Sequence, residues 1–201
     1  MTDADPTGWF ERLYEAAARG ERIVPWDRGG PSRLLADWAR GAPAGGGRRA
    51  LVVGSGLGDD AEFVASLGYA TVAFDVAPTA VATALQRFPG SPVDYHVADL
   101  LDPPAGWRDA FDLLVESLTV QSLPPALHAR ATANVAGFVA AGGTLLVIAS
   151  AADTPPASGP PWPLTRSEVD AFADGGLRAL RVEDLGHGDD RRWRAELRRG
   201  P

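Results

Sequence analysis

The 201-residue sequence contains no cysteine, no lysine and a single methionine. The absence of cysteine excludes disulfides, a thiolate nucleophile and zinc held by sulfur, and the absence of lysine excludes Schiff-base catalysis. No apolar run approaches the ~18 residues that a membrane span needs. The first residues also lack the basic and apolar stretches of a secretion signal. We therefore expect a globular cytoplasmic protein without a membrane partner.

Positive charge is in the minority. The 19 basic residues, all of them arginine, stand against 26 acidic residues, which gives a net charge of −7. Binding to a phosphate backbone depends on clustered cations, so this balance argues against a nucleic-acid partner. The densest arginine group lies at 191–199, where it alternates with apolar residues. That spacing favours the solvated face of a strand over an anion-binding site.

Helical and strand patterns alternate along most of the chain. Helices are expected at 7–19 and 32–40, and the glycine-rich connector 41–47 leads out of them. Beyond it, strands are expected at 50–53, 70–75, 93–97, 111–116 and 144–150, with helices at 59–67, 79–88 and 125–140 between them. Such alternation is typical of a parallel sheet.

The C-terminal part departs from this alternation. A capping box at Thr165 to Glu168 predicts a helix that runs to about residue 173. Strands follow near 177–185 and 192–198, and the turn between them is too short for a parallel connection. The fold class is therefore α/β, with a mostly parallel seven-stranded sheet that ends in an antiparallel hairpin.

The length and the 45% hydrophobic content suffice for one buried core. We expect a single domain over residues 1–201, in which 1–45 forms a helical lid and 46–201 forms the α/β core. The sequence contains no internal repeat.

The stretch LVVGSGLGDD (51–60) reads as a buried strand, a tight loop and the start of a helix. Gly54, Gly56 and Gly58 allow the backbone to approach a ligand closely. Asp59 or Asp60 can cap the helix. Two carboxylates at a helix N-terminus repel a dinucleotide pyrophosphate, whereas they suit a ligand with an ammonium group and no phosphate. S-adenosylmethionine (SAM) is such a ligand.

Acidic residues end the next strands, where a doubly wound sheet binds its ligand. Asp75, followed by Val76, is placed to accept hydrogen bonds from two ribose hydroxyls, although it can also cap a helix. Asp99 is placed to accept from the adenine amino group while Leu100 packs on the ring; its alternative role is to cap a turn. Glu116 ends the fourth strand near the expected sulfonium. Its carboxylate either contacts the cofactor and the acceptor or supports the residues that contact them.

The chain resembles the thiopurine and halide/thiol methyltransferase family of class I, Rossmann-like SAM-dependent enzymes. Three motifs carry the resemblance. Pro25 to Pro31 matches the family's P-W-D-x-G-x-P loop, and Gly159 to Trp162 matches its late G-P-P-aromatic segment. The family's G-C-G-x-G-x-D loop is matched by Gly54, Ser55, Gly56, Gly58 and Asp60. The resemblance implies that Trp26 belongs to a lid over SAM and that Trp162 lies close to the acceptor.

The departures from the family concern the acceptor more than the cofactor. Ser55 replaces a cysteine that acts mainly through its backbone. Ser117 stands where halide/thiol members tend to have an aromatic residue, and Thr119 and Gln121 make the same loop more polar. A thiol or other soft nucleophile is the first expectation for the acceptor, with an oxygen or nitrogen atom of a natural-product intermediate as the alternative.

Histidine offers one further catalytic candidate, His128, because its helix begins after the strand that Glu116 ends; a solvated helix position is the alternative. No histidine has a partner at metal-ligand spacing, so no metal is expected. We expect a small-molecule methyl acceptor as the partner and leave the oligomeric state open. A non-catalytic SAM-binding protein and an NAD-dependent Rossmann protein remain as other interpretations.

Overall fold

The computed structural model describes residues 6–155 and 157–201. The helical elements, short 3-10 turns (η) included, are α1 (Gly8–Ala18), α2 (Arg33–Ala39), α3 (Asp59–Ser66), α4 (Pro78–Arg87), η1 (Ala105–Trp107), η2 (Val120–Ser122), α5 (Pro125–Gly137), α6 (Arg166–Asp170), η3 (Ala171–Gly175) and η4 (Gly188–Asp190). The strands are β1 (Arg49–Val53), β2 (Ala70–Asp75), β3 (Asp94–Val97), β4 (Phe111–Ser117), β5 (Val139–Ala152), β6 (Leu164–Thr165), β7 (Leu177–Leu185) and β8 (Arg192–Arg199).

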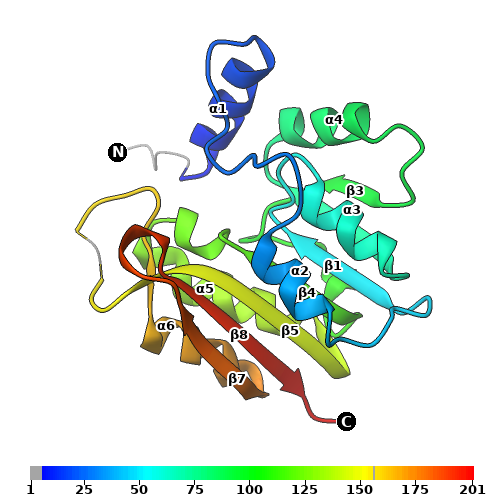
Figure 1. Cartoon of the computed structure of the whole chain (residues 1–201), viewed down its shortest axis with the longest axis vertical. Helices are drawn as coiled ribbons and strands as arrows, with labels where there is room; N and C mark the ends of the chain where they lie inside the picture. The colour runs from blue at the N-terminus through cyan, green and yellow to red at the C-terminus, as the bar shows by residue number, and fades with distance from the viewer. Residues whose placement is uncertain (1–5, 156) are drawn as a thin grey trace.

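One sheet organises the molecule, with the strand order β3-β2-β1-β4-β5-β8-β7 (Figure 1). The strands β1 to β5 pair in parallel, and β8 and β7 complete the sheet in antiparallel pairing. The predicted fold class is therefore confirmed. The short strand β6, which the sequence pattern did not predict, pairs with the end of β5.

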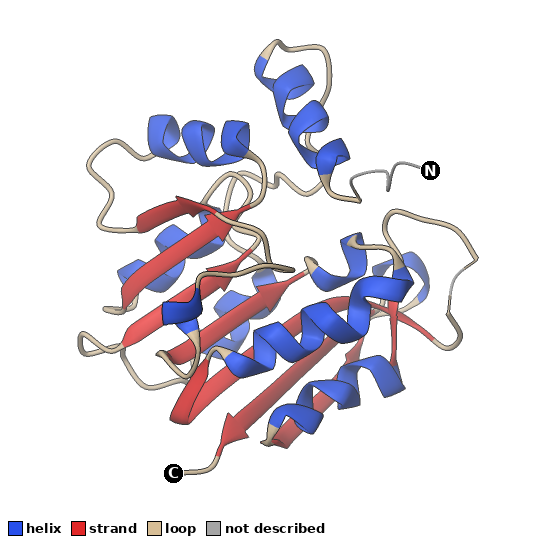
Figure 2. Cartoon of the chain, turned by 180° about the vertical axis from the view of Figure 1, so that it is seen from behind, coloured by secondary structure: helices blue, strands red, loops and turns tan. Residues whose placement is uncertain are grey.

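Helices cover both faces of the sheet. On one face, Leu35 of α2 and Ala61 of α3 pack against alternate residues of the central strands. On the other face, seen from behind in Figure 2, α5 and α6 contribute Val135 and Val169 to the larger core cluster. The central strands are buried on both faces, which explains their continuous apolar runs. Helix α1 packs on α4 at the end of the sheet, where Glu11 accepts hydrogen bonds from Thr79.

The boundary between α5 and β5 differs from the expectation. The predicted helix 125–140 ends at Gly137, and β5 already begins at Val139. Gly142 and Gly143 do not stop the helix but accommodate an irregularity inside β5, where the pairing with β4 shifts its register. A Cβ on Gly143 would lie 2.9 Å from the carbonyl oxygens of Ala140 and Phe111, so only glycine fits there.

The expected caps also fall differently. Gly58, with φ of 97°, is the N-cap of α3, and no side chain caps this helix, so the prediction that Asp59 or Asp60 caps it is wrong. Both acids lie in the first helical turn, where they face the positive end of the helix dipole. The capping box is confirmed, because Thr165 and Glu168 exchange their hydrogen bonds at the start of α6. Within the described residues no helix is long and apolar enough to cross a membrane.

Candidate functional site

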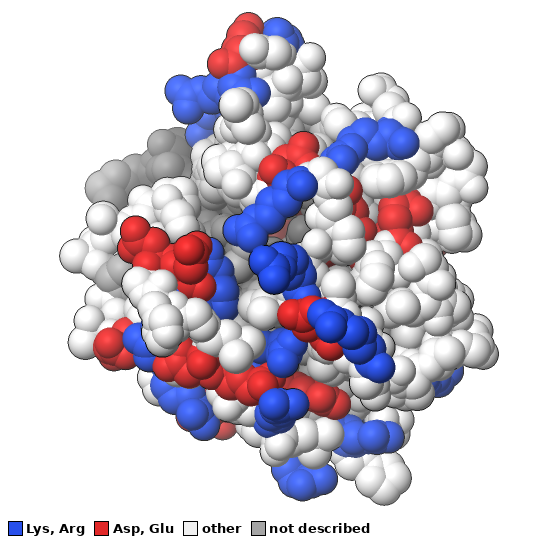
Figure 3. All heavy atoms as spheres, viewed as in Figure 1, with Lys and Arg blue, Asp and Glu red and all other residues white. Residues whose placement is uncertain are grey.

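A cavity of about 1040 Å³ opens at the carboxyl ends of β1, β2 and β4. Figure 3 shows the hollow in the middle of one face of the molecule, with arginine and acidic side chains around it. Three parts of the chain form its wall: the N-terminal segment, the loops that follow the parallel strands, and the turn between β7 and β8. This position at the strand ends is the one expected for a ligand in a doubly wound sheet.

The glycine-rich loop lines the cavity as expected. Gly54, Gly56 and Gly58 have φ values of 60°, 53° and 97°, which side chains rarely allow. At Gly54 the space is also closed, because a Cβ would lie 2.4 Å from Thr119 Oγ1. The neighbouring Ser55 is buried, and its Oγ has no hydrogen-bond partner among the described residues. The loop is therefore a close-fitting backbone cradle with one free polar atom.

Asp75 ends β2 beside this loop and is 6% exposed. Its Oδ2 accepts from Gly56 N (2.9 Å) and its Oδ1 from Ala77 N (2.9 Å), so the carboxylate fixes the loop geometry. Burial raises the pKa of Asp75, and the backbone N–H groups of Ala77, Gly56 and Val76 oppose that effect. Asp75 and Val76 both line the cavity.

Asp60 connects three segments around the cavity. Its Oδ1 accepts from Ser32 N (2.7 Å), just before α2. Burial raises the pKa of Asp60, and hydrogen bonds from Ser32 N and the Ser117 side chain counteract it. Since Ser117 ends β4, Asp60 joins the N-terminal segment, α3 and the loop after β4 at one point.

Asp99 and Leu100 lie in the cavity wall after β3, as predicted. Asp99 Oδ1 accepts from Leu101 N (2.8 Å), so this residue also has the turn-capping role considered as its alternative. The carboxylate keeps its other oxygen for a ligand. Leu100 is 5% exposed and belongs to the core as well as to the wall.

The N-terminal segment supplies an aromatic wall. Trp26 Nε1 donates to the Tyr14 hydroxyl (2.9 Å), and that hydroxyl lies close to Gly56. Burial raises the pKa of Tyr14, and the negative charge of Asp75 adds to the effect. Trp26 and Tyr14 both line the cavity. Tyr14 was missed, because its helical spacing indicated only an inward-facing core residue.

Glu116 differs from its predicted role. It does not line the cavity and is fully buried. On β4 it shares the face of Leu114, which belongs to the core on the α5 side. Its Oε1 accepts from Thr119 N (2.8 Å) and Val120 N (2.9 Å), while Oε2 has no partner among the described residues. Glu116 therefore holds the loop after β4 from behind, which corrects its assignment as a contact for cofactor or acceptor.

The loop after β4 forms the polar end of the cavity. Thr119 Oγ1 donates to Val53 O (3.0 Å), which ties the loop to the end of β1. Gln121 exchanges hydrogen bonds with Ser150 at the end of β5. All three polar side chains line the cavity.

Trp162 approaches this loop through its backbone. Its N–H donates to Gln121 O, and its indole ring lies against Gly159. The prolines Pro160 and Pro161 line the cavity, whereas the indole does not. The late proline-rich segment therefore reaches the cavity through its prolines, but the Trp162 ring, which the resemblance implies lies close to the acceptor, is not in the cavity wall.

His128 lies outside the cavity wall. It is 5% exposed, its Nδ1 lies 2.7 Å from Glu168 Oε1, and its Nε2 lies 2.8 Å from Leu123 O. Both ring nitrogens are thus used inside the protein, which joins α5 to α6. This geometry corrects the catalytic assignment of His128: its role is structural, and it is not solvated either.

The turn between β7 and β8 is a part of the site that the sequence did not reveal. Leu185, Gly186, Asp190 and Arg192 line the same cavity as the glycine-rich loop. The arginine-rich stretch at 191–199 was assigned to a solvated strand face, which fails for Arg192. Among the described residues, no three histidine, aspartate or glutamate side chains gather as metal ligands do.

The order of the strands is that of the Rossmann-like methyltransferase fold, and the cavity lies at the carboxyl ends of its parallel strands. A family model described as a methyltransferase domain matches residues 51–147, from β1 into β5. The chain is a SAM-dependent methyltransferase of a small-molecule acceptor, and the cofactor and enzyme class predicted from the sequence are confirmed.

Within that class the chain is similar to thiol methyltransferases. It is 27% identical to the probable thiol methyltransferase 2 of Arabidopsis thaliana over 187 residues, which cover 92% of this chain and 79% of the relative. It is 26% identical to thiocyanate methyltransferase 1 of the same plant over 185 residues, or 90% and 78% of the two chains. The solved structure of the N-methyltransferase NodS from Bradyrhizobium japonicum, in complex with S-adenosyl-L-homocysteine (SAH), has a TM-score of 0.75, 18% identity and coverage of 98% of this chain and 100% of NodS. The resemblance expected from the motifs is therefore confirmed.

Proposed function

We propose that the chain methylates a thiol or another soft nucleophile that reaches the cavity as an anion. One observation carries this proposal: the loop after β4 and Ser150 give the polar end of the cavity neutral hydroxyl and amide side chains, and no histidine of residues 6–155 and 157–201 lines the cavity. A thiol, with a pKa of ~8.5, is partly ionised near neutral pH, whereas an alcohol or a protonated amine needs a base that removes its proton. The names of the two plant relatives, which specify a thiol and thiocyanate, support the same acceptor class.

The residues at the strand ends fit the cofactor. We assign to Asp75 the ribose hydroxyls, because it lies in the cavity wall at the end of β2 and its backbone hydrogen bonds leave part of the acceptor capacity of the carboxylate unused. Asp99 is assigned to the adenine amino group through Oδ2, with Leu100 packed on the ring. The unpartnered Ser55 Oγ and the backbone of Gly54 and Gly56 face the rest of the cofactor.

When bound, SAM supplies an electrophilic methyl group on a sulfonium. The task of the chain is then to orient the acceptor and to exclude water. We assign the orientation to Thr119, Gln121 and Ser150, which are fixed to one another or to β1 by hydrogen bonds. The aromatic wall with Tyr14 and Trp26 covers the cavity from the N-terminal side.

Calorimetric titration with SAH tests the cofactor site without any knowledge of the acceptor. Wild type should bind SAH, and Asp75→Ala should weaken binding by at least about tenfold, since a buried charge-assisted hydrogen bond contributes 1.5–3 kcal/mol. Asp75→Asn serves as a second variant if the alanine variant does not fold. Asp102→Asn, at an exposed aspartate beyond the cavity wall, is the control. Binding of NAD instead of SAH by wild type would contradict the assignment.

The acceptor is tested by turnover with SAM and a panel of thiols, halides, phenols and amines. The proposal expects turnover of thiols above all others. Turnover of phenols or amines, with none for thiols or halides, would refute the acceptor class while leaving the cofactor assignment intact.

A further inference from the structure

Arg192 lies at the acceptor end of the cavity. It is paired directly across from Ser150 in the antiparallel ladder between β5 and β8, so the two side chains share one face of the sheet. Ser150 is bonded to Gln121, and all three residues line the cavity. Arg192 is therefore a neighbour of the side chains to which we assign the acceptor.

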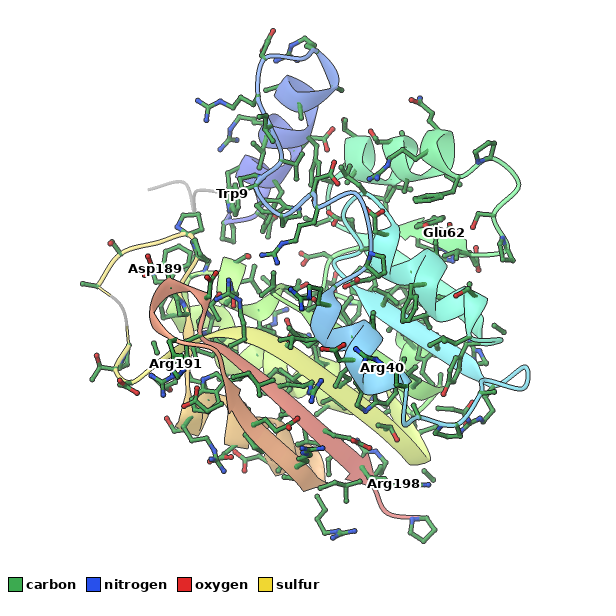
Figure 4. The ribbon with its side chains drawn as sticks, in the orientation of Figure 1. Trp9, Arg40, Glu62, Asp189, Arg191 and Arg198 are labelled. Carbon is green, nitrogen blue, oxygen red and sulfur yellow. The ribbon has the colours of Figure 1, made fainter. Side chains whose placement is uncertain are left out.

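Two arginines near Arg192, one just before β8 and one within it, are neutralised by carboxylates. Arg191, labelled in Figure 4 near the turn, pairs with Asp184 (2.6 Å) and Asp153 (2.7 Å). Arg194 pairs with Glu183 at 2.8 Å. Neither Arg191 nor Arg194 lines the cavity.

Arg192 has no such partner. Its Nη1 donates to the carbonyl oxygens of Asp189 (2.7 Å) and Arg191 (2.9 Å), which fixes the guanidinium against its own turn. Among the residues that the structure describes, no carboxylate lies within 4.0 Å of it, and Nε and Nη2 make no hydrogen bond. The side chain is half-buried. A partly desolvated guanidinium with free N–H donors favours a bound anion, because the anion supplies both the opposite charge and the hydrogen-bond acceptors.

The cavity wall contains charges of both signs, five arginines and seven aspartates. Arg28 and Arg33 of the N-terminal segment line the same cavity, and within the described part of the chain neither is paired with a carboxylate. Figure 3 shows both arginine and acidic side chains around the hollow. Asp190 also lines the cavity, and it is exposed, as Arg28 and Arg33 are, so solvent screens the charges of all three while Arg192 is half-buried.

We propose that the methyl acceptor is a small organic thiol that carries a carboxylate, and that Arg192 binds this carboxylate through Nε and Nη2. The proposal rests on the thiol acceptor proposed above and adds its second functional group. A carboxylate matches the planar fork of a guanidinium in a bidentate pair. Arg192 is then a specificity-determining residue: it selects acids among thiols and leaves cofactor binding unchanged.

The test compares two matched pairs of thiols, 3-mercaptopropionate with 3-mercaptopropionamide and thiosalicylate with 2-mercaptobenzamide. Within each pair the thiol is kept and only the charge of the second group changes. Wild type should prefer the acid in kcat/KM. Arg192→Gln should raise KM for the acid by about 10- to 100-fold, the loss expected for a charged hydrogen bond, with little change for the amide.

Arg191→Gln is the matched control, since this neighbour has the same side chain but is neutralised outside the cavity. It should keep the preference for the acid, and SAH affinity should be the same in all three proteins. Equal turnover of acid and amide by wild type, or an equal loss for both substrates in Arg192→Gln, overturns the role of Arg192 and leaves the proposed thiol acceptor in place. Turnover of neither thiol, with SAH binding intact, overturns the proposed thiol acceptor and the inference with it.

Discussion

Glu116 makes the unfolding free energy depend on pH in a direction that is unusual for a carboxylate. Burial raises its pKa from 4.5 to about 7, and the hydrogen bonds from Val120 N and Thr119 N only reduce this effect. The raised pKa means that the folded state holds the proton more tightly than the unfolded state. Between about pH 4.5 and pH 7 folding therefore takes up a proton, and stability from this group falls as the pH rises.

The size of the effect follows from the two pKa values. Each unit of pKa difference corresponds to about 1.4 kcal/mol, and integration from pH 5 to pH 8 gives a loss of about 2.5 kcal/mol. Below pH 4.5 the group is protonated in both states, and the contribution is complete. Above pH 7 it is lost, because the folded protein then contains a buried carboxylate with one unpartnered oxygen.

Glu116→Gln removes the titratable carboxyl group and keeps the shape of the side chain. The amide oxygen can still accept from Thr119 N and Val120 N, while the amide nitrogen takes the place of the unpartnered oxygen. We expect the unfolding free energy of wild type relative to this variant to fall by about 2.5 kcal/mol between pH 5 and pH 8. Urea denaturation at each pH unit measures it.

Glu15→Gln, at an exposed position of α1, is the matched control and should show no such trend. A difference between wild type and Glu116→Gln that stays constant within about 0.5 kcal/mol from pH 5 to pH 8 would refute the reasoning. If the unfolding free energy of wild type instead rose with pH relative to Glu116→Gln, folding would lower the pKa of Glu116. That result would indicate a cationic partner for the carboxylate.

Two further predictions concern residues away from the cofactor. His128→Ala should lower the unfolding free energy by about 1–3 kcal/mol, because Leu123 O and Glu168 each lose a hydrogen bond, while the SAH dissociation constant stays within about twofold; a loss of turnover at unchanged stability would restore a catalytic role. The loop 20–31, which contributes Pro25 and Trp26 to the cavity wall, should become protected from proteolysis when SAH binds, and unchanged cleavage would argue against a lid.

Much of the fold could be predicted because the central strands are buried on both faces and are punctuated by glycine and proline. The strand β1 at Arg49–Val53 and the helix α3 at Asp59–Ser66 lie within a residue of the expected ranges. The end of α5 was misplaced because Phe138 and Val139 are apolar and suit a helix or a strand equally. The pairing of Val139 with Phe111 favours the strand. These residues lie 28 positions apart in the sequence, so the local sequence pattern does not reveal their pairing.

That the proposed cofactor-binding residues line one cavity could be predicted for a topological reason. In a parallel sheet, residues that end successive strands meet at one edge, so Asp75 and Asp99 had to lie near Gly54. The orientation of Glu116 was not predictable in the same way. Its place at the strand end was right, but the alternation of β4 and the N–H groups of Thr119 and Val120 turn it away from the cavity.

The proposed acceptor end of the cavity is formed by segments that only the tertiary structure brings together: the loop after β4, the prolines 160–161 and the turn between β7 and β8. None of these segments contributes to the proposed cofactor contacts, so substitutions there can change the acceptor without loss of SAM binding. Glu116 and Thr119 form the link between the two ends, since Glu116 accepts from Thr119 N while Thr119 Oγ1 donates to Val53 O beside the glycine-rich loop. A change that frees this link should therefore affect turnover more than the affinity for either ligand, because it disturbs the alignment of cofactor and acceptor and leaves their separate contacts in place.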